Sequence, residues 1–248
     1  MIRSCLWAIA LVGLVFARWP QLDLQVSGWF YDPQAKFWLA RIGWLELVRQ
    51  LAMQGANLTV VLALAGTVQA WALGARATVP LRLWGFALAL FVLGPGLLVN
   101  VILKTYWGRA RPGSVIEFGG SAQFTPPFQI ADECVRNCSF VSGEAAAAAA
   151  MMIVVATFFL HLVPAARRFV AIASCILLAL LPGILRIMTG RHFLSDVIFA
   201  NLFILLLALV LAKLLRITPV PATVTPGALK RDLVAGIGRL VPGWSRKP

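Results

Sequence analysis

Long apolar runs separated by short polar connections are the feature of this sequence that most constrains its fold. Six runs approach the roughly 20 residues that an α-helix needs to cross a bilayer. They cover residues 5–18, 55–74, 83–103, 142–163, 169–188 and 196–215. Hydrophobic residues make up 60% of the chain and charged residues only 12%, which excludes an ordinary soluble domain. The sequence therefore predicts an all-α, polytopic membrane protein with six transmembrane helices.

The first run is open to a second interpretation. Arg3 precedes a short apolar core that ends in VFA at 15–17, a pattern that cleaved signal peptides also show. We expect a retained helix, with a signal peptide as the alternative.

Basic residues are spread along the chain, whose net charge is +13. They are neither gathered in a soluble arm nor interleaved with a stacking surface, which argues against a nucleic-acid partner. In a six-helix arrangement, the ends and short connections of one side carry Arg3, Arg76, Arg82, Arg167, Arg168, Lys213 and Arg216. The positive-inside rule assigns that side, with both termini, to the cytoplasm of a multi-pass bacterial inner membrane protein.

The outer, periplasmic side then receives residues 19–54, the loop 104–141 and the tight connection that contains TGRHFLSD. Residues 19–54 hold four tryptophans and are typical of an amphipathic stretch in the membrane interface. The outer side also carries the bases Lys104, Arg109, Arg111, Arg136, Arg186 and Arg191. Because these bases run against the positive-inside tendency, we expect an anionic ligand on this side.

Residues 217–248 differ in composition from residues 1–216, which we interpret as one six-span domain. After a start interrupted by prolines, the tail carries apolar residues at helical spacing with bases beside them: Leu229, Leu233, Ile237 and Leu240, with Lys230, Arg231 and Arg239. This pattern predicts a basic cytoplasmic tail whose amphipathic helix lies on the anionic inner leaflet.

Three polar clusters fall on the outer side. They are KTYWGRARP with Lys104 and Arg111, CSFVSGEA with Ser142 and Gly143, and RIMTGRHFLSD with Arg186, His192 and Asp196. Lysine and arginine supply charge and hydrogen-bond donors for phosphate, and a helix N-terminus adds free N–H groups. His192 stands about one helical turn before Asp196, so the carboxylate can fix the imidazole tautomer and leave the other nitrogen free to attack phosphorus.

Taken singly, several residues have plainer explanations. Arg109, Arg136 and Arg191 are explained as lipid headgroup anchors, and His161 as a packing histidine. Caps of helices would explain Ser142 and Asp196, and a favourable charge at a helix N-terminus would explain Glu144.

The four cysteines fall into two pairs. Cys134 and Cys138 flank VRN in a polar loop and could form a disulfide in an oxidising compartment, although a gap of three residues gives a small ring. Cys5 and Cys175 lie inside apolar runs, where we expect small buried hydrophobic residues.

Through these clusters the sequence resembles the type 2 phosphatidic acid phosphatase (PAP2) superfamily, which shares its helical core with the vanadium haloperoxidases. The family signature is Lys, six residues, Arg-Pro; then Pro-Ser-Gly-His; then Ser-Arg, five residues, His, three residues, Asp. Here six residues separate Lys104 from Arg111, and Arg186 is followed by five residues, His192, three residues and Asp196. The resemblance covers most of residues 1–215.

The resemblance implies a phosphatase of phosphorylated lipids without a metal ion or cofactor, and it implies roles for individual residues. His192 would be the nucleophile that forms a phosphohistidine, and Asp196 would orient it. The phosphate would be bound by Lys104, Arg111, Ser142, Gly143 and Arg186. These groups would supply the positive charge that a metal ion provides in other phosphatases.

The sequence departs from the family pattern at Val141, which replaces proline, at Leu185, which replaces serine, and at Glu144. The last departure matters most, because Glu144 replaces the family's second histidine, which protonates the leaving oxygen. Two hypotheses remain open: Glu144 is the general acid, or the substrate departs as a better leaving group, such as a pyrophosphate or the phosphate of an anomeric sugar carbon.

The sequence thus predicts an integral membrane lipid phosphatase with its site at the outer membrane boundary. Lipid A phosphate and polyprenyl pyrophosphate, such as undecaprenyl pyrophosphate, are favoured by Glu144 over phosphatidylglycerophosphate or phosphatidate. A lipid phosphotransferase of the same fold is one alternative, and a non-catalytic binder or transporter of anionic lipids is another. The pairing of His192 with Asp196 argues against the second, and the oligomeric state is left open.

Overall fold

The computed structural model describes residues 1–217 and 223–240, and the regular structure of these ranges is helical. The α-helices are α1 (Ile2–Arg18), α2 (Gln21–Gly28), α3 (Gly43–Leu73), α4 (Leu81–Phe91), α5 (Lys104–Tyr106), α6 (Gly143–Phe159), α7 (Arg168–Met188), α8 (Leu194–Leu214) and α9 (Pro226–Leu240). A π-helix, η3 (Val92–Leu103), joins α4 to α5. The 3₁₀ turns are η1 (Trp38–Arg41), η2 (Gly74–Arg76), η4 (Pro112–Ser114), η5 (Ile116–Phe118), η6 (Leu160–Leu162) and η7 (Ala165–Arg167). The prediction of an all-α fold is confirmed.

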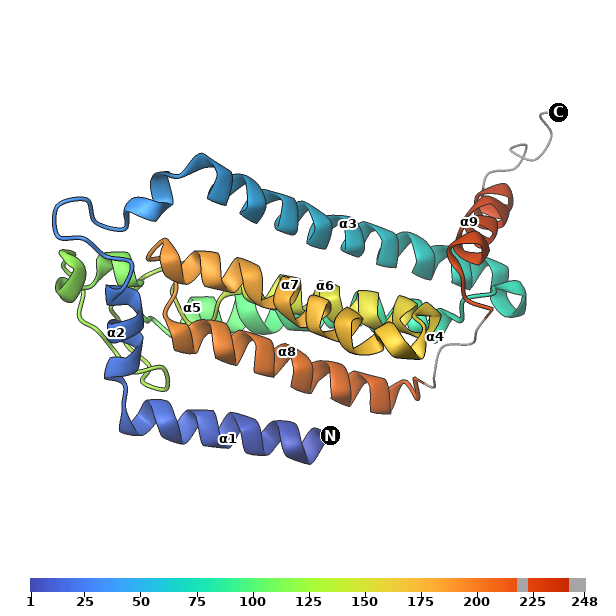
Figure 1. Cartoon of the computed structure of the whole chain (residues 1–248). Helices are drawn as coiled ribbons and strands as arrows, with labels where there is room; N and C mark the ends of the chain where they lie inside the picture. Colours follow the sequence, from blue (N-terminus) through green and yellow to red (C-terminus); the bar gives the residue numbers. More distant parts are fainter. Residues whose placement is uncertain (218–222, 241–248) are drawn as a thin grey trace.

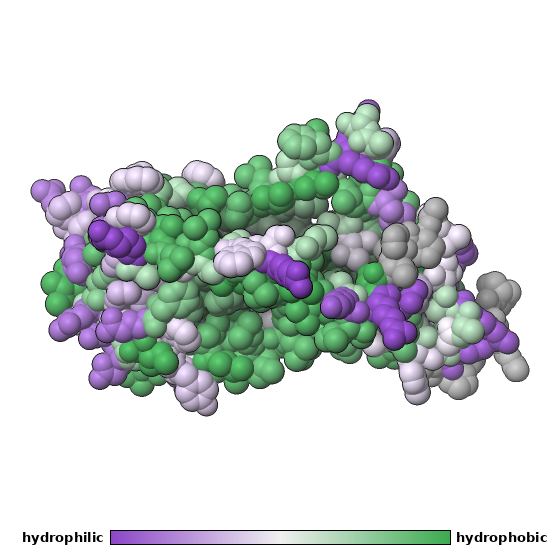
Figure 2. Space-filling model, turned by 90° about the horizontal axis from the view of Figure 1, so that it is seen from below, coloured by the Kyte–Doolittle hydropathy of each residue, from purple (hydrophilic) through white to green (hydrophobic). Residues whose placement is uncertain are grey.

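Within the described ranges, five helical stretches are long and apolar enough to cross a membrane. They are Gly43–Arg76, Leu81–Tyr106, Gly143–Leu162, Ala165–Met188 and Leu194–Leu214, and the bent pair α1 and α2, at 83° to each other, would make a sixth. The long helices run side by side (Figure 1). Seen from below, the middle of the molecule is apolar and hydrophilic residues gather mainly toward its two ends, as in a polytopic membrane protein (Figure 2).

The segment 19–54 differs from the expected interfacial stretch. Its second part belongs to α3, which begins at Gly43 and not at residue 55. Glu46, Arg49 and Gln50 lower the hydropathy of this first part of α3, which concealed the helix in the sequence. Polar side chains in this part of α3 can therefore reach the end of the bundle where the three polar clusters lie.

Helix α6 packs between several neighbours because its first half consists of small residues. Ala145, Ala146, Ala148 and Ala150 are buried, and α6 contacts α3, α7, α8 and η3. Alanine side chains allow helix backbones to approach closely, as the run at 145–150 predicts. The N-terminus of α6 is thereby held among the elements that carry the other two clusters.

At the opposite end of the bundle, α9 is tied to the connection between α3 and α4. The Asp232 carboxylate accepts hydrogen bonds from the backbone N–H groups of Thr78 (2.8 Å) and Val79 (3.1 Å) and from the Thr78 hydroxyl. Close by, His161 Nε2 lies 3.0 Å from the carbonyl oxygen of Val224, which agrees with a packing role. Residues 218–222 and 241–248 of the expected tail lie outside the described residues.

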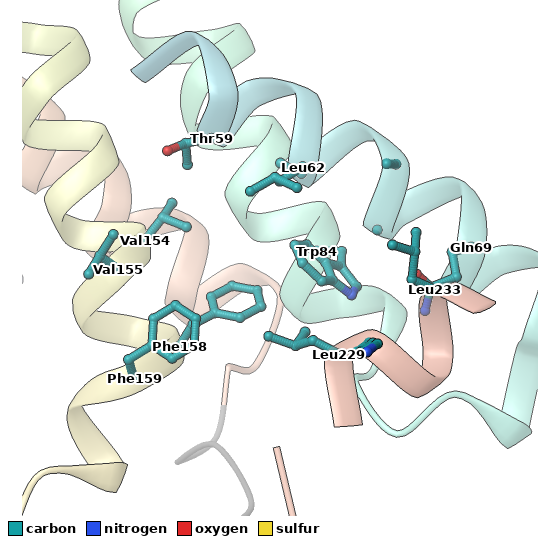
Figure 3. A pocket seen from close by; sticks show the side chains of 14 residues that line it. Thr59, Leu62, Gln69, Trp84, Val154, Val155, Phe158, Phe159, Leu229 and Leu233 are labelled. Carbon is teal, nitrogen blue, oxygen red and sulfur yellow. The ribbon is translucent and has the colours of Figure 1, made fainter. Parts of the chain in front are cut away.

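An apolar cavity of about 280 Å³ lies between α3, α4, α6 and α9. Trp84, Phe158 and Leu229 are among the residues that line it (Figure 3). Phe158 comes from the last turn of α6, whereas the polar cluster of α6 lies at its first turn. The cavity is therefore remote from the polar clusters.

Candidate active site

The three polar clusters meet at one end of the bundle, where η3 and α5 end, α6 begins and α7 turns into α8 (Figure 1). The backbone N–H of Ser142, at the start of α6, donates to the carbonyl oxygen of Asp196 at the start of α8 (3.2 Å). The backbone N–H of His192 donates to the carbonyl oxygen of Arg186 at the end of α7 (3.2 Å). The first of these bonds joins the second cluster to the third, and the other lies within the third cluster.

His192 lies in the turn between α7 and α8 and is only 2% exposed. Burial lowers the pKa of His192 to about 4, because the charged imidazolium is poorly solvated there. The ring is therefore neutral near pH 7, as a nitrogen nucleophile requires. Its Nδ1 lies 3.6 Å from Oδ2 of Asp196, somewhat longer than a hydrogen bond. Because Nδ1 faces the carboxylate, Nε2 is the nitrogen available for attack.

Asp196 is completely buried and belongs to a larger polar network. Its Oδ2 accepts hydrogen bonds from the Ser139 hydroxyl and from the backbone N–H of Phe193 (2.9 Å). Its Oδ1 accepts one from the Arg109 guanidinium at 2.6 Å. Asp196 therefore caps the start of α8, as the plainer explanation has it, and also faces His192, and its catalytic role stays a prediction.

Arg109 is not a lipid headgroup anchor, which was the plainer explanation that the sequence offered for it. Its side chain is completely buried, and it forms ion pairs with Asp196 (2.6 Å) and with Asp23 of α2 (2.8 Å). It also donates to the hydroxyl of Ser195 and to the carbonyl oxygen of Thr125, both at 2.9 Å. A buried guanidinium needs this many partners to offset its loss of hydration.

Asp23 completes the network from α2, a helix that sequence reasoning placed at the membrane surface. Its carboxylate accepts hydrogen bonds from the backbone N–H (2.8 Å) and the hydroxyl of Ser195. Contacts between residues so far apart in the sequence leave no local pattern. The polar character of Asp23 between apolar neighbours was the only available signal.

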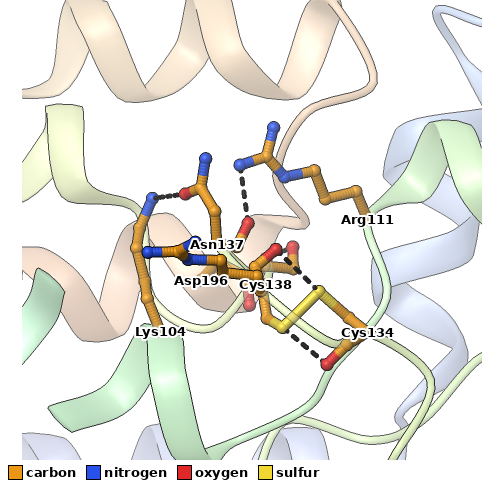
Figure 4. Close-up of a disulfide and its surroundings, with 8 residues drawn as sticks. Lys104, Arg111, Cys134, Asn137, Cys138 and Asp196 are labelled. Atoms are coloured by element: carbon orange, nitrogen blue, oxygen red, sulfur yellow. Dashed lines mark hydrogen bonds between the residues drawn. A yellow bond between two sulfur atoms is a disulfide. The ribbon is translucent and has the colours of Figure 1, made fainter. Parts of the chain in front are cut away.

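Lys104 and Arg111 both contact Asn137 (Figure 4). Lys104 Nζ donates to the Asn137 side-chain oxygen (3.0 Å), and Arg111 donates to its carbonyl oxygen (2.8 Å). Asn137 lies in the short loop closed by a disulfide between Cys134 and Cys138. Burial, and next the neighbouring charge of Arg191, lower the pKa of Arg111. Asn137 thus holds the two cations close together although their positive charges repel each other.

Glu144 contacts two guanidinium groups. Its Oε1 accepts a hydrogen bond from Arg49 of α3 (2.9 Å) and lies 3.6 Å from Nε of Arg186. Its Oε2 is buried and has no hydrogen-bond partner among the described residues. Arg49 also pairs with Glu46. Sequence reasoning missed Arg49, because it lies in the part of α3 that was taken for an interfacial stretch.

The N-terminus of α6 faces the same cations. The buried Ser142 is the N-cap, and its hydroxyl accepts a long hydrogen bond from the backbone N–H of Ala145 (3.4 Å). A Cβ atom on Gly143 would lie 3.1 Å from Oδ1 of Asn100 and 3.5 Å from Nζ of Lys104. The tight contact would be with Asn100, so glycine lets the Asn100 side chain approach the start of α6, and Lys104 lies beside this positive end of the helix, which favours an anion there.

The structure brings together all eight residues proposed from sequence for catalysis and phosphate binding: Lys104, Arg111, Ser142, Gly143, Glu144, Arg186, His192 and Asp196. Arg136 and Arg191 are exposed, and Arg136 belongs to the disulfide loop. A neutral imidazole next to several cations can attack the phosphorus of a bound phosphate ester.

Comparison with known proteins agrees with this geometry. The family described as the PAP2 superfamily matches residues 82–217. The chain is 30% identical over 197 residues to the lipid A 4′-phosphatase of Francisella tularensis subsp. novicida, which covers 77% of this chain and 85% of that protein.

Two rhizobial relatives match over shorter stretches. The lipid A 4′-phosphatase of Rhizobium leguminosarum is 41% identical over 132 residues, or 53% of each chain. That of Rhizobium etli is 41% identical over 110 residues, or 44% of this chain and 41% of that protein. No solved structure matches the chain.

Proposed function

Since this chain belongs to the PAP2 superfamily, we propose that it removes the 4′-phosphate of a lipid A-type glycolipid. It is a membrane lipid phosphatase, and the named relatives act on lipid A. The observation that carries the proposal is the buried, neutral imidazole of His192 beside Asp196. This pair has no purpose in a site that only binds anions.

In the proposed first step, Nε2 of His192 attacks phosphorus. An N–P bond forms, the bond from phosphorus to the sugar oxygen breaks, and the sugar oxygen takes up a proton. Water then attacks the phosphohistidine and gives a proton to the carboxylate left on Glu144. The N–P bond breaks, and orthophosphate and the neutral imidazole are released. Asp196 stabilises the positive charge of the ring during both steps. The cations Lys104, Arg111 and Arg186 stabilise the charge on the phosphoryl oxygens.

Glu144 is the proposed proton donor. A phosphate at the 4′ position of a sugar leaves an ordinary secondary alkoxide, which is a poor leaving group without protonation. The hypothesis of a better leaving group therefore does not suit this substrate. Arg49 fixes the position of Oε1, and Oε2, which lacks a partner in the described part of the chain, is free to carry the proton.

We further propose a bacterial inner membrane location with the site on the periplasmic face. The basic connections of the opposite end support this topology. Residues 1–216 would form the phosphatase domain. The tail 217–248 would then be cytoplasmic, with α9 close to the inner leaflet.

The test is phosphate release by the detergent-purified protein from lipid A, phosphatidylglycerophosphate, undecaprenyl pyrophosphate and phosphatidic acid, beside His192→Ala. We expect release from lipid A that the variant lacks, and a mass loss of one phosphate from the sugar distal to the reducing end. Equal release by wild type and His192→Ala would contradict the assigned nucleophile. Phosphate recovered on an added lipid or sugar acceptor, in place of orthophosphate, would identify a phosphotransferase.

A further inference from the structure

A second pocket, with a volume of about 250 Å³, adjoins the phosphate-binding residues. Three segments form its walls, namely residues 35–41, 111–114 and 189–191. Arg111 is both a proposed phosphate ligand and part of this wall. The pocket is therefore the immediate neighbour of the site where the reacting phosphate is proposed to bind.

Packing and hydrogen bonds hold the three walls together. The backbone N–H of Gly113 donates to the carbonyl oxygen of Gly190 at 2.9 Å. The buried Phe37 packs against Gly190, where a Cβ atom would overlap its ring, and Gly190 has a φ of 66°. Phe37 also packs edge-on against Phe118, with ring centroids 5.4 Å apart. The pocket is thus an open recess in the surface, with exposed Arg41 and Arg191 in its walls, and the packing of Phe37 and the Gly113–Gly190 hydrogen bond fix those walls.

The charged side chains that line the pocket are all basic. Over the described part of the chain they are Lys36, Arg41, Arg111 and Arg191, with no aspartate or glutamate among the lining residues. The Lys36 ammonium is directed to the Tyr31 hydroxyl, at 3.4 Å. Arg41 and Arg191 have no side-chain hydrogen bond or ion pair within residues 1–217 and 223–240.

This concentration of positive charge is not neutralised by the protein. Arg111 and Arg191 line the same pocket, and burial and then the charge of Arg191 lower the pKa of Arg111. A guanidinium without a carboxylate partner is well suited to a phosphate or carboxylate of a ligand. Ser114 and Thr189 also line the pocket, and the Thr189 hydroxyl already donates to the carbonyl oxygen of Leu185 at 2.8 Å.

We propose that this pocket binds a second anionic group of the same lipid whose phosphate is cleaved. The proposal rests on the proposed function and narrows its substrate class to glycolipids with two anionic headgroup substituents. Arg111 adjoins both positions, so the two anions would lie on either side of one guanidinium. Arg41 and Arg191, which line the pocket with Arg111, would bind the second group.

The experiment compares lipid A that carries two phosphates with lipid A that carries only the 4′-phosphate. We expect wild type to have a kcat/KM for the bisphosphorylated lipid at least tenfold above that for the monophosphorylated lipid. Arg41→Ala should lose most of this preference, about tenfold, since it removes a charged hydrogen-bond donor to the second anion. Arg136→Ala, which removes the same charge from an exposed position outside the pocket, should keep the preference.

Binding to His192→Ala in detergent, measured for both lipids by native mass spectrometry, gives a result that does not depend on turnover. Adding Arg41→Ala to this protein should weaken the binding of the bisphosphorylated lipid about tenfold and that of the monophosphorylated lipid less than twofold. The inference would be overturned if Arg41→Ala weakened the binding of both lipids equally, or if it left the binding of both unchanged. An inactive wild type that still shows the binding difference would contradict the proposed function alone.

A neighbouring anionic phospholipid is the other source of a second anion. In that case phosphatidylglycerol added to the micelles would raise the turnover of monophosphorylated lipid A by wild type and not by Arg41→Ala. This outcome would overturn the proposal, because the second group would then belong to a separate molecule. We expect no such activation.

Discussion

Arg109 is a single buried cation on which the position of the proposed catalytic carboxylate depends. It forms ion pairs with Asp23 and Asp196, and all three side chains have no exposed surface. Breaking a buried ion pair from one side leaves an uncompensated charge, which costs about 3–5 kcal/mol. We therefore expect Arg109→Gln to be destabilised by about this amount, as measured by thermal unfolding in detergent. The exposed Arg136→Gln is the matched control, and equal melting of the two variants would contradict this account.

The proposed role of Glu144 as proton donor is tested by replacing its carboxyl group with an amide of nearly the same shape. Glu144→Gln should lose about 10²-fold or more in kcat on a lipid phosphate, the range expected for general acid catalysis. On an aryl phosphate ester, whose leaving group departs without a proton, the loss should be small. If both substrates lose activity equally, Glu144 acts instead by holding Arg49 and Arg186, which it contacts.

His192 should remain neutral far below the usual range of histidine, because burial lowers its pKa to about 4. The neutral ring is the proposed attacking form, so protonation should remove the nucleophile only as the pH falls through about 4. Titration by ¹⁵N NMR in a His161→Gln protein, where His192 is the remaining histidine, measures this directly. The spectrum of His192→Ala assigns the signal. A midpoint near 6.5, the ordinary value, would show that the ring is solvated.

At the scale of elements, the loop of five residues from Cys134 to Cys138 holds two of the proposed phosphate ligands in position. Asn137 accepts hydrogen bonds from Lys104 and Arg111, and the disulfide between Cys134 and Cys138 limits the conformations of this loop. In Cys134→Ser/Cys138→Ser we expect KM to rise severalfold with little change in kcat, because the two cations are no longer held in place before the substrate binds. Dithiothreitol, which reduces the disulfide, should raise the KM of wild type similarly and leave the KM of the double variant unchanged. Unaltered kinetics after reduction would contradict this role.

The sequence predicted the helices well where hydropathy and helix length agree. The expected runs at 169–188 and 196–215 match α7 and α8 within two residues. α3 was misjudged, because its first turns carry Glu46 and Arg49, which look like a polar connection when hydropathy alone is read. The polar side chains stay in a helix because they pair with each other and with Glu144.

The proximity of two site residues could be predicted where both lie in one segment at helical spacing. His192 and Asp196 are one turn apart, so their proximity follows from sequence. Other groups of the site have partners from distant segments: Asp23 of α2 pairs with Arg109, and Arg49 of α3 pairs with Glu144. Such contacts depend on how the helices pack, and a single sequence gives no signal for them.

The whole molecule has bases at both ends, but for different reasons. At the end with the three polar clusters, Lys104, Arg111 and Arg186 surround a proposed anion site. At the other end, Arg76 and Arg167 lie in short connections between apolar helices, where the positive-inside rule applies without a ligand. Only the second set is evidence for the proposed topology, in which the polar clusters lie on the periplasmic side.

This topology predicts which positions a membrane-impermeant maleimide can reach in intact cells. Gln129→Cys, in the exposed loop near the proposed site, should be labelled without lysis, and Arg167→Cys, exposed at the other end, only after the inner membrane is permeabilised. Both variants are made in Cys5→Ala/Cys175→Ala protein, in which Cys134 and Cys138 are joined to each other. The reverse pattern would place the phosphate-binding residues in the cytoplasm. A lipid on the periplasmic leaflet could then not be the substrate, so this measurement also constrains the proposed function.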